Sequence, residues 1–133
     1  MLSLIYLLGY SILSSLVSIP SDAEETSIVL RGEEHTTNAL LELTANTKER
    51  IDVCAGWLAP SVSVGVPELK KGMIDLVTRG VKYRYITEIT KDNLAYCKEL
   101  AKYVELRHLD GIRGNFVVNE SHYIATAIVE KEA

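Results

Sequence analysis

The sequence predicts an α/β domain with a mixed, largely parallel sheet of about five strands flanked by helices. The main observation is the stretch 49–88, which reads as an apolar strand, a loop, an amphipathic helix and a second strand, the order of a βαβ unit. A second observation is the length of 133 residues, which suits one domain. Because such crossovers are right-handed, the two strands should lie parallel with the helix on one face.

A helix is expected over residues 33–47, ahead of this unit. Its apolar residues recur at helical spacing, and an acidic pair lies in the first turn, where the helix dipole favours negative charge. The side chains expected on its core face are Ala39, Leu40, Leu43 and Thr47. The first strand is expected at 51–56.

Asp52 stands inside this first strand, where a carboxylate is costly unless it is paired. We expect it near the mouth of the strand or paired with a lysine, and the alternative is that it lines a site. The next stretch, residues 57–66, reads as a loop and holds the single tryptophan of the chain. It follows a parallel strand at the carboxyl end, where ligands bind in open α/β sheets.

The helix of the βαβ unit is expected between Pro67, which suits a first helical turn, and Gly80, which suits a C-terminal cap. Its buried stripe is expected to contain Leu69, Met73, Ile74 and Val77. Residues 81–87 alternate in polarity and are rich in β-formers, which predicts the second strand.

Thr90 is the expected N-cap of a further helix over residues 91–104. The spacing of its apolar side chains predicts a core-facing set of Leu94, Cys97, Ala101 and Val104. The remaining segments are expected to form strands, the last two joined as a hairpin: 106–109, 115–118 and 123–129.

Residues 1–20 (MLSLIYLLGYSILSSLVSIP) carry no charged side chain. As a helix of about 30 Å they would cross a bilayer core. They are interpreted as a membrane anchor, as a signal peptide, or as the end of a longer hydrophobic region or a misassigned start. The predicted organisation is this segment followed by a domain over residues 21–133. We expect the protein to be membrane-associated, with the domain in the cytoplasm.

Composition and motifs limit the chemistry. A net charge of −4 and a pI of about 5.4 argue against nucleic acid as a partner. Cys54 and Cys97 are expected to be free thiols. The sequence has no glycine-rich phosphate loop, Cys-x-x-Cys pair, His-Glu-x-x-His helix or Gly-x-Ser-x-Gly turn, so neither a cofactor nor a metal is expected.

The blocks YITEITKDNLAYCKEL (85–100) and ELRHLDGIRGNF (105–116) resemble the sensor region of archaeal membrane-associated histidine kinases, particularly those of ammonia-oxidising archaea. The resemblance covers residues 28–127. It implies one half of a phospholipase D fold, which is similar to the effector-binding domain of archaeal regulators of the TrmB type. It also implies a histidine kinase or another signalling domain as a partner, and a truncated or stand-alone sensor.

The phospholipase D signature, His-x-Lys-x4-Asp, is matched best here by Arg113, Asn115 and Glu120. Arginine cannot act as the nucleophile, and asparagine cannot supply the charge of the lysine. The resemblance therefore implies the fold and argues against the reaction.

A ligand site is expected in the crevice at the carboxyl ends of the strands. The residues predicted to converge there are Gly56, Trp57, Thr87, Glu88, His108 and Arg113. The charges around His108 either solvate a turn or bind a small anion such as a carboxylate or phosphate. The predicted function is a non-catalytic ligand- or signal-sensing module of a signal-transduction protein. The alternatives are a degenerate phosphodiesterase and a structural module that forms homodimers.

Overall fold

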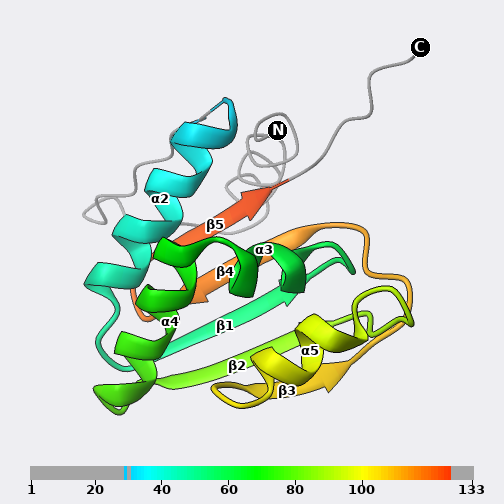
Figure 1. Ribbon diagram of the computed structural model, residues 1–133. Helices are drawn as coiled ribbons and strands as arrows, with labels where there is room; N and C mark the ends of the chain where they lie inside the picture. Colours follow the sequence, from blue (N-terminus) through cyan, green and yellow to red (C-terminus); the bar gives the residue numbers. More distant parts are fainter. Residues whose placement is uncertain (1–28, 30, 127–133) are drawn as a thin grey trace, which may run out of the picture.

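A five-stranded mixed sheet with helices along one face forms the domain (Figure 1). The computed structural model describes residue 29 and residues 31–126. The strands are β1 (Arg50–Ala55), β2 (Lys82–Thr87), β3 (Glu105–His108), β4 (Asn115–Asn119) and β5 (Tyr123–Thr126). The helices in this part of the chain are α2 (Glu33–Asn46), α3 (Ala59–Gly65), α4 (Pro67–Thr78) and α5 (Leu94–Leu100).

The strand order is β3-β2-β1-β4-β5. The pairs β1–β2 and β2–β3 are parallel, whereas β1–β4 and β4–β5 are antiparallel. The predicted mixed α/β sheet of five strands is thus confirmed, with the parallel part confined to the first three strands. Because β1 is central, the chain leaves it towards β2 on one side and returns as β4 on the other.

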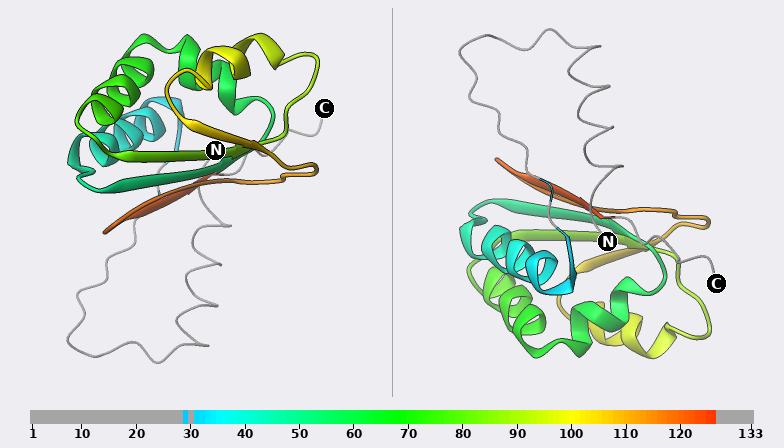
Figure 2. Two further views of the ribbon diagram at one scale, coloured as in Figure 1. Left: turned by 90° about the horizontal axis from the view of Figure 1, so that it is seen from below. Right: turned by 90° about the horizontal axis from the view of Figure 1, so that it is seen from above.

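The core lies between the sheet and the helices. Figure 2 shows α2, α3, α4 and α5 on the same side of the sheet, and alternate residues of β1 point towards them. Ile51 is 1% exposed, and Leu76 of α4 and Leu100 of α5 are fully buried. Burying a side chain of this size stabilises the fold by about 1.5–3 kcal/mol.

The helix predicted over residues 33–47 is confirmed as α2. Leu43 and Thr47 of its predicted core face are buried. The Thr47 hydroxyl donates to the Leu43 carbonyl at 2.7 Å and accepts from the Asn119 side chain at 3.0 Å, which joins the end of α2 to the end of β4. The predicted hairpin of β4 and β5 is also confirmed, up to Thr126; residues 127–133 lie outside the described part.

The prediction of a loop over residues 57–66 is wrong, because α3 occupies most of it. Pro60 lies in the first turn of α3, where its fixed φ suits a helix and its missing N–H costs nothing. The buried stripe of α4 also differs from the prediction. Leu76, which was not predicted, is fully buried beside the predicted Met73.

The helix predicted over residues 91–104 is shorter in the structure, where it is α5, and its core-facing side differs from the predicted one. Its start is held by Thr90 and Asn93, since the Asn93 amide donates to the Thr90 hydroxyl at 3.3 Å and the Thr90 amide donates to Asn93 Oδ1 at 2.8 Å. The buried set is Asn93, Cys97, Leu100 and Val104. The predicted core positions Leu94 and Ala101 are instead exposed, because the buried polar Asn93 takes the first place on the inner face.

Candidate functional site

A cavity of about 530 Å³ lies on the helix side of the sheet, above the carboxyl half of β1. Its walls come from α2, α3, α4 and the residues before β4, and its floor from β1 and β2. Most of the lining is apolar and includes Leu40, Val53, Val62, Leu69, Met73 and Ile112. A cavity of this size and character suits a small organic molecule, since such sites span about 300–1,000 Å³.

Two tyrosines of β2 contribute the polar part of the floor. The Tyr85 hydroxyl and the Ser63 hydroxyl of α3 are hydrogen-bonded at 3.0 Å. Burial raises the pKa of Tyr85 to about 12, against a smaller opposing effect of the Ser63 hydrogen bond. Burial likewise raises the pKa of Tyr83. Both phenols are therefore neutral at physiological pH and present uncharged hydrogen-bonding groups.

The rim of the cavity is fixed where β1 ends. The Gly56 amide donates to Asn115 Oδ1 at 2.8 Å, and the Gly56 carbonyl accepts from the Thr87 hydroxyl at 3.1 Å. Trp57 follows, 44% exposed, and its carbonyl accepts from the buried Asn93 side chain at 2.8 Å. These bonds hold the turn between β1 and α3 against β4 on one side and the start of α5 on the other.

The structure brings together half of the residues predicted for a ligand site. Gly56, Trp57 and Arg113 line the cavity. The other three lie outside its wall, at the ends of β2 and β3, and hold connections in place. Their contacts are Thr87 Oγ1 with the Gly56 carbonyl, Glu88 Oε2 with the Gly111 amide, and His108 Nδ1 with the Ile89 amide.

The charged groups predicted around His108 do not converge on one point of the cavity. His108 Nε2 lies 2.8 Å from Asp110 Oδ1 at the edge of the sheet. Arg113 is exposed at the cavity rim. The structure thus favours the interpretation in which the charges near His108 solvate a turn. Of the predicted site residues that line the cavity, Arg113 is the one that carries a positive charge.

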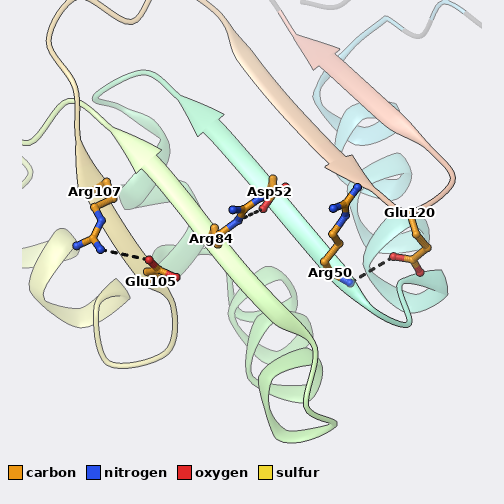
Figure 3. Close-up of polar contacts among 6 residues, drawn as sticks. All are labelled: Arg50, Asp52, Arg84, Glu105, Arg107 and Glu120. Carbon is orange, nitrogen blue, oxygen red and sulfur yellow. Dashed lines mark hydrogen bonds and ion pairs between the residues drawn. The ribbon is translucent and has the colours of Figure 1, made fainter.

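The residues of the degenerate phospholipase D signature have separate structural positions. Asn115 bonds the Gly56 amide, as described above. The Glu120 carboxylate accepts from the Arg50 amide at 3.4 Å (Figure 3). It also accepts from the Lys48 amide at 2.6 Å, and the two bonds tie the β4–β5 turn to the segment between α2 and β1. These backbone bonds, that of Lys48 first, lower the pKa of Glu120.

Several lining residues were not predicted. Tyr83 and Tyr85 had a sequence signal, because they alternate with charged residues in β2 and so must share the inner face with Val53. Ser63 had no sequence signal, since residues 57–66 were predicted to form a loop. The threonines of α2 that line the cavity also had none, because polar residues on a helix usually face water; they are Thr36, Thr37 and Thr44.

No group of three or more His, Cys, Asp or Glu side chains that could hold a metal ion occurs in the described part of the chain. None of the helices in this described part is long and apolar enough to cross a membrane. Residues 1–20, which carry the anchor and signal-peptide interpretations, lie outside the described residues. Cys54 and Cys97 are free, as predicted.

The fold is similar to that of a solved archaeal protein. No protein-family profile and no curated protein matches the chain. Among solved structures it is similar to TrmBL2, an archaeal chromatin protein, with a TM-score of 0.55 and 20% identity over 87% of this chain. The match spans 44% of the TrmBL2 chain, less than half of its length. The TrmB-type part of the predicted resemblance is therefore confirmed for the fold.

The prediction that excluded nucleic acid as a partner is wrong. TrmBL2, which shares this fold, is described with a novel mode of DNA binding. A net charge of −4 was a poor ground for exclusion. Overall charge describes the sum over a chain, whereas DNA contacts depend on local groups of lysine and arginine.

Proposed function

We propose that this domain is a non-catalytic sensing module that binds a small organic molecule in the cavity between α2, α3 and the sheet. The observation that carries the proposal is the position of the cavity at the carboxyl end of β1. There the chain departs to β2 on one side and returns as β4 on the other. Such a reversal point is where ligands bind in open α/β sheets.

The lining defines the class of ligand. The apolar walls favour an apolar body, and the neutral hydroxyls of Ser63 and Tyr85 favour one or two hydrogen-bonding groups on it. Arg113 at the rim suits a polar end that reaches solvent. A ligand held there would touch helices of different segments, α2 and α3, and so bias their relative position. A change in the relative position of two helices is a way in which a non-catalytic domain transmits a signal.

The module would serve as the input part of a larger signal-transduction protein, such as a sensor kinase or a TrmB-type regulator. Its fold and its cavity support this proposal. The residues aligned with the phospholipase D signature make structural hydrogen bonds or lie at the cavity rim, which supports a role without catalysis.

The test uses the full chain and the fluorescent probe anilinonaphthalene sulfonate, which has an apolar ring system and one anionic end. Excitation of Trp57, the single tryptophan, should give sensitised probe emission if the probe lies in the cavity. We expect saturable binding of one probe molecule, displaced by those members of a metabolite library that fit the cavity.

A matched pair of variants locates the site. Ala59→Phe should fill the cavity and weaken probe binding at least tenfold, because Ala59 lines it. Ala45→Phe introduces the same side chain at an exposed position of α2 and should leave binding unchanged. Equal binding by both variants, with circular dichroism showing that both are folded, would reject the cavity as the site.

A second candidate function is DNA binding, favoured by the DNA binding described for TrmBL2. Fluorescence anisotropy of a labelled duplex at low and moderate salt tests it directly. Binding that weakens steeply with salt would support DNA as a partner, because released counterions dominate such affinities. An anisotropy that stays constant at low salt would count against this candidate and leave the sensing proposal untouched.

A further inference from the structure

The face of the sheet opposite the helices carries an apolar patch. Figure 2 shows every described helix on the other side. Large side chains of this open face that are substantially exposed include Ile86 at 37%, Phe116 at 48% and Val118 at 42%. Strand pairing sets Cys54 of the central strand directly beside Ile86 and Phe116. Together these four residues, the open-face patch, line a hollow of about 450 Å³.

Two ion pairs line the same hollow. Arg84 donates to both carboxylate oxygens of Asp52, at 2.6 and 2.7 Å, and Arg107 lies 3.3 Å from Glu105 (Figure 3). The hydrogen bonds from Arg84 lower the pKa of Asp52. These carboxylates are already neutralised by neighbours on the same face. A segment that covers the patch therefore needs apolar side chains and no charge of its own.

The chain itself contains such a segment. Residues 1–20 hold no charged side chain and are rich in leucine and isoleucine. Residues 21–28, which connect them to the described domain, include the acidic Asp22, Glu24 and Glu25. The strand residues of the open face include more cations than anions, namely Arg50, Lys82, Arg84 and Arg107 against Asp52 and Glu105. The charges of the connecting segment are thus complementary to this face.

The connecting segment is long enough to reach the patch. The start of α2 lies close to the end of β5, because Thr36, Thr37 and Thr126 line the same cavity. Eight residues span at most about 26 Å when extended. A sheet of five strands is roughly 19 Å across, at about 4.8 Å for each neighbouring pair. The chain can therefore pass around the β5 edge and bring residues 1–20 to the patch, which begins on the neighbouring strand β4.

We propose that the hydrophobic N-terminal segment, residues 1–20, docks on the open-face patch of its own domain. Covering the patch removes Ile86, Phe116 and Val118 from water and at the same time shields the apolar segment, which makes the contact favourable for both surfaces. The segment is then a built-in cover of the sheet. A bilayer or a second copy of the chain would compete with the domain for the same residues.

Cys54 gives a direct measurement, because it lies within the patch while Cys97, the other cysteine, is 2% exposed on the inner face of α5. The rate of maleimide addition to Cys54 in the full chain reports how well the patch is covered. Leu8→Asp with Ile12→Asp should release the segment and raise this rate at least fivefold. The control, Leu94→Asp with Leu109→Asp, alters two exposed leucines away from the patch and should leave the rate unchanged.

Cross-linking then identifies the occupant. In Ser14→Cys, a short bismaleimide should join the new cysteine to Cys54 within one chain, as peptide mass spectrometry would show. Cross-links found only between chains would overturn the proposal in favour of a second copy on this face. An unchanged Cys54 rate in the aspartate variant would overturn it as well. So would loss of the intramolecular cross-link on adding phosphatidylglycerol vesicles that sediment with the chain, since the segment would then prefer the bilayer.

Discussion

Asn115 Oδ1 accepts a hydrogen bond of 2.8 Å from the Gly56 amide, which joins residues 59 apart in the sequence. The bond fastens the start of β4 to the end of the central strand, at the rim of the cavity. Without it the Gly56 amide would have to find another partner in a half-buried place. This single contact therefore links the order of the sheet to the shape of the candidate site.

Replacing Asn115 tests this contact. Asn115→Ala should lower the free energy of unfolding by about 1–2 kcal/mol, because it removes the acceptor of a partly buried amide. Urea unfolding followed by Trp57 fluorescence measures the change. Asn115→Asp retains an oxygen at the same place and should cost less. If both variants had the same free energy of unfolding as the parent chain, the hydrogen bond would not contribute to stability.

Tyr85 should make stability depend on alkaline pH. Burial raises its pKa in the folded chain to about 12, above the value of 10.0 that an exposed phenol has. The neutral phenol therefore stabilises the fold fully below pH 10, and this contribution is lost as the pH rises towards 12. A pKa shift of this size corresponds to a loss of about 3 kcal/mol in the free energy of unfolding over that pH range.

Unfolding in urea at pH 9 and at pH 11.5 measures this dependence. Tyr85→Phe should lose less stability than the parent chain over this interval, because phenylalanine has no proton to release. Tyr96→Phe, at an exposed tyrosine of α5, is the control and should follow the parent chain. A Tyr85→Phe profile that coincides with the parent profile would contradict the assignment.

Much of the fold was predictable because local signals agreed with tertiary packing. The alternation of polarity in 81–87 and the Pro67 to Gly80 frame of α4 depend on neighbours in the sequence, and both appear in the structure. The inner face of α5 was not predictable. It is set by Asn93, whose side chain donates to the Trp57 and Glu88 carbonyls. The bond to Trp57 joins residues 36 apart, and such a contact leaves no periodic pattern in the sequence.

The candidate site was predictable only where it follows directly from strand ends. Gly56 and Trp57 come immediately after β1, where the rule for parallel strands predicts a crevice, and both line the cavity. Ser63 reaches the cavity through α3, a helix of seven residues that is too short to be stable alone and packs against α4 and α5. The residues at the rim of the cavity were therefore predictable from the sequence, whereas Ser63 in its wall was not.

The chain should have no phosphodiesterase activity. Arg113 and Asn115 lack the chemistry of the histidine and lysine in the phospholipase D signature. Incubation of the full chain with bis-nitrophenyl phosphate should release no nitrophenol above the buffer rate. Glu120→Ala should lower the melting temperature, since the carboxylate holds the Lys48 and Arg50 amides. Turnover by the parent chain that disappears in Glu120→Ala would instead establish an enzyme.

Gly72 of α4 faces α2 closely enough that a methyl group there would meet Thr44. A Cβ at position 72 would lie 3.0 Å from Thr44 Cγ2. The Thr44 hydroxyl donates to the Leu40 carbonyl at 2.7 Å, so its side chain cannot rotate away without losing that bond. The steric cost should therefore exceed the gain of about 1 kcal/mol that alanine brings over glycine inside a helix.

Gly72→Ala should thus destabilise the parent chain, whereas the same change in a Thr44→Ser background should stabilise it. Serine keeps the hydroxyl and removes the methyl group that clashes. Urea unfolding of the four chains of this cycle measures the coupling between the two positions, which we expect to reach about 1 kcal/mol or more. Equal effects of Gly72→Ala in both backgrounds would show that α2 and α4 are not held together at this point, and that the wall of the cavity formed by Thr44 is free to move.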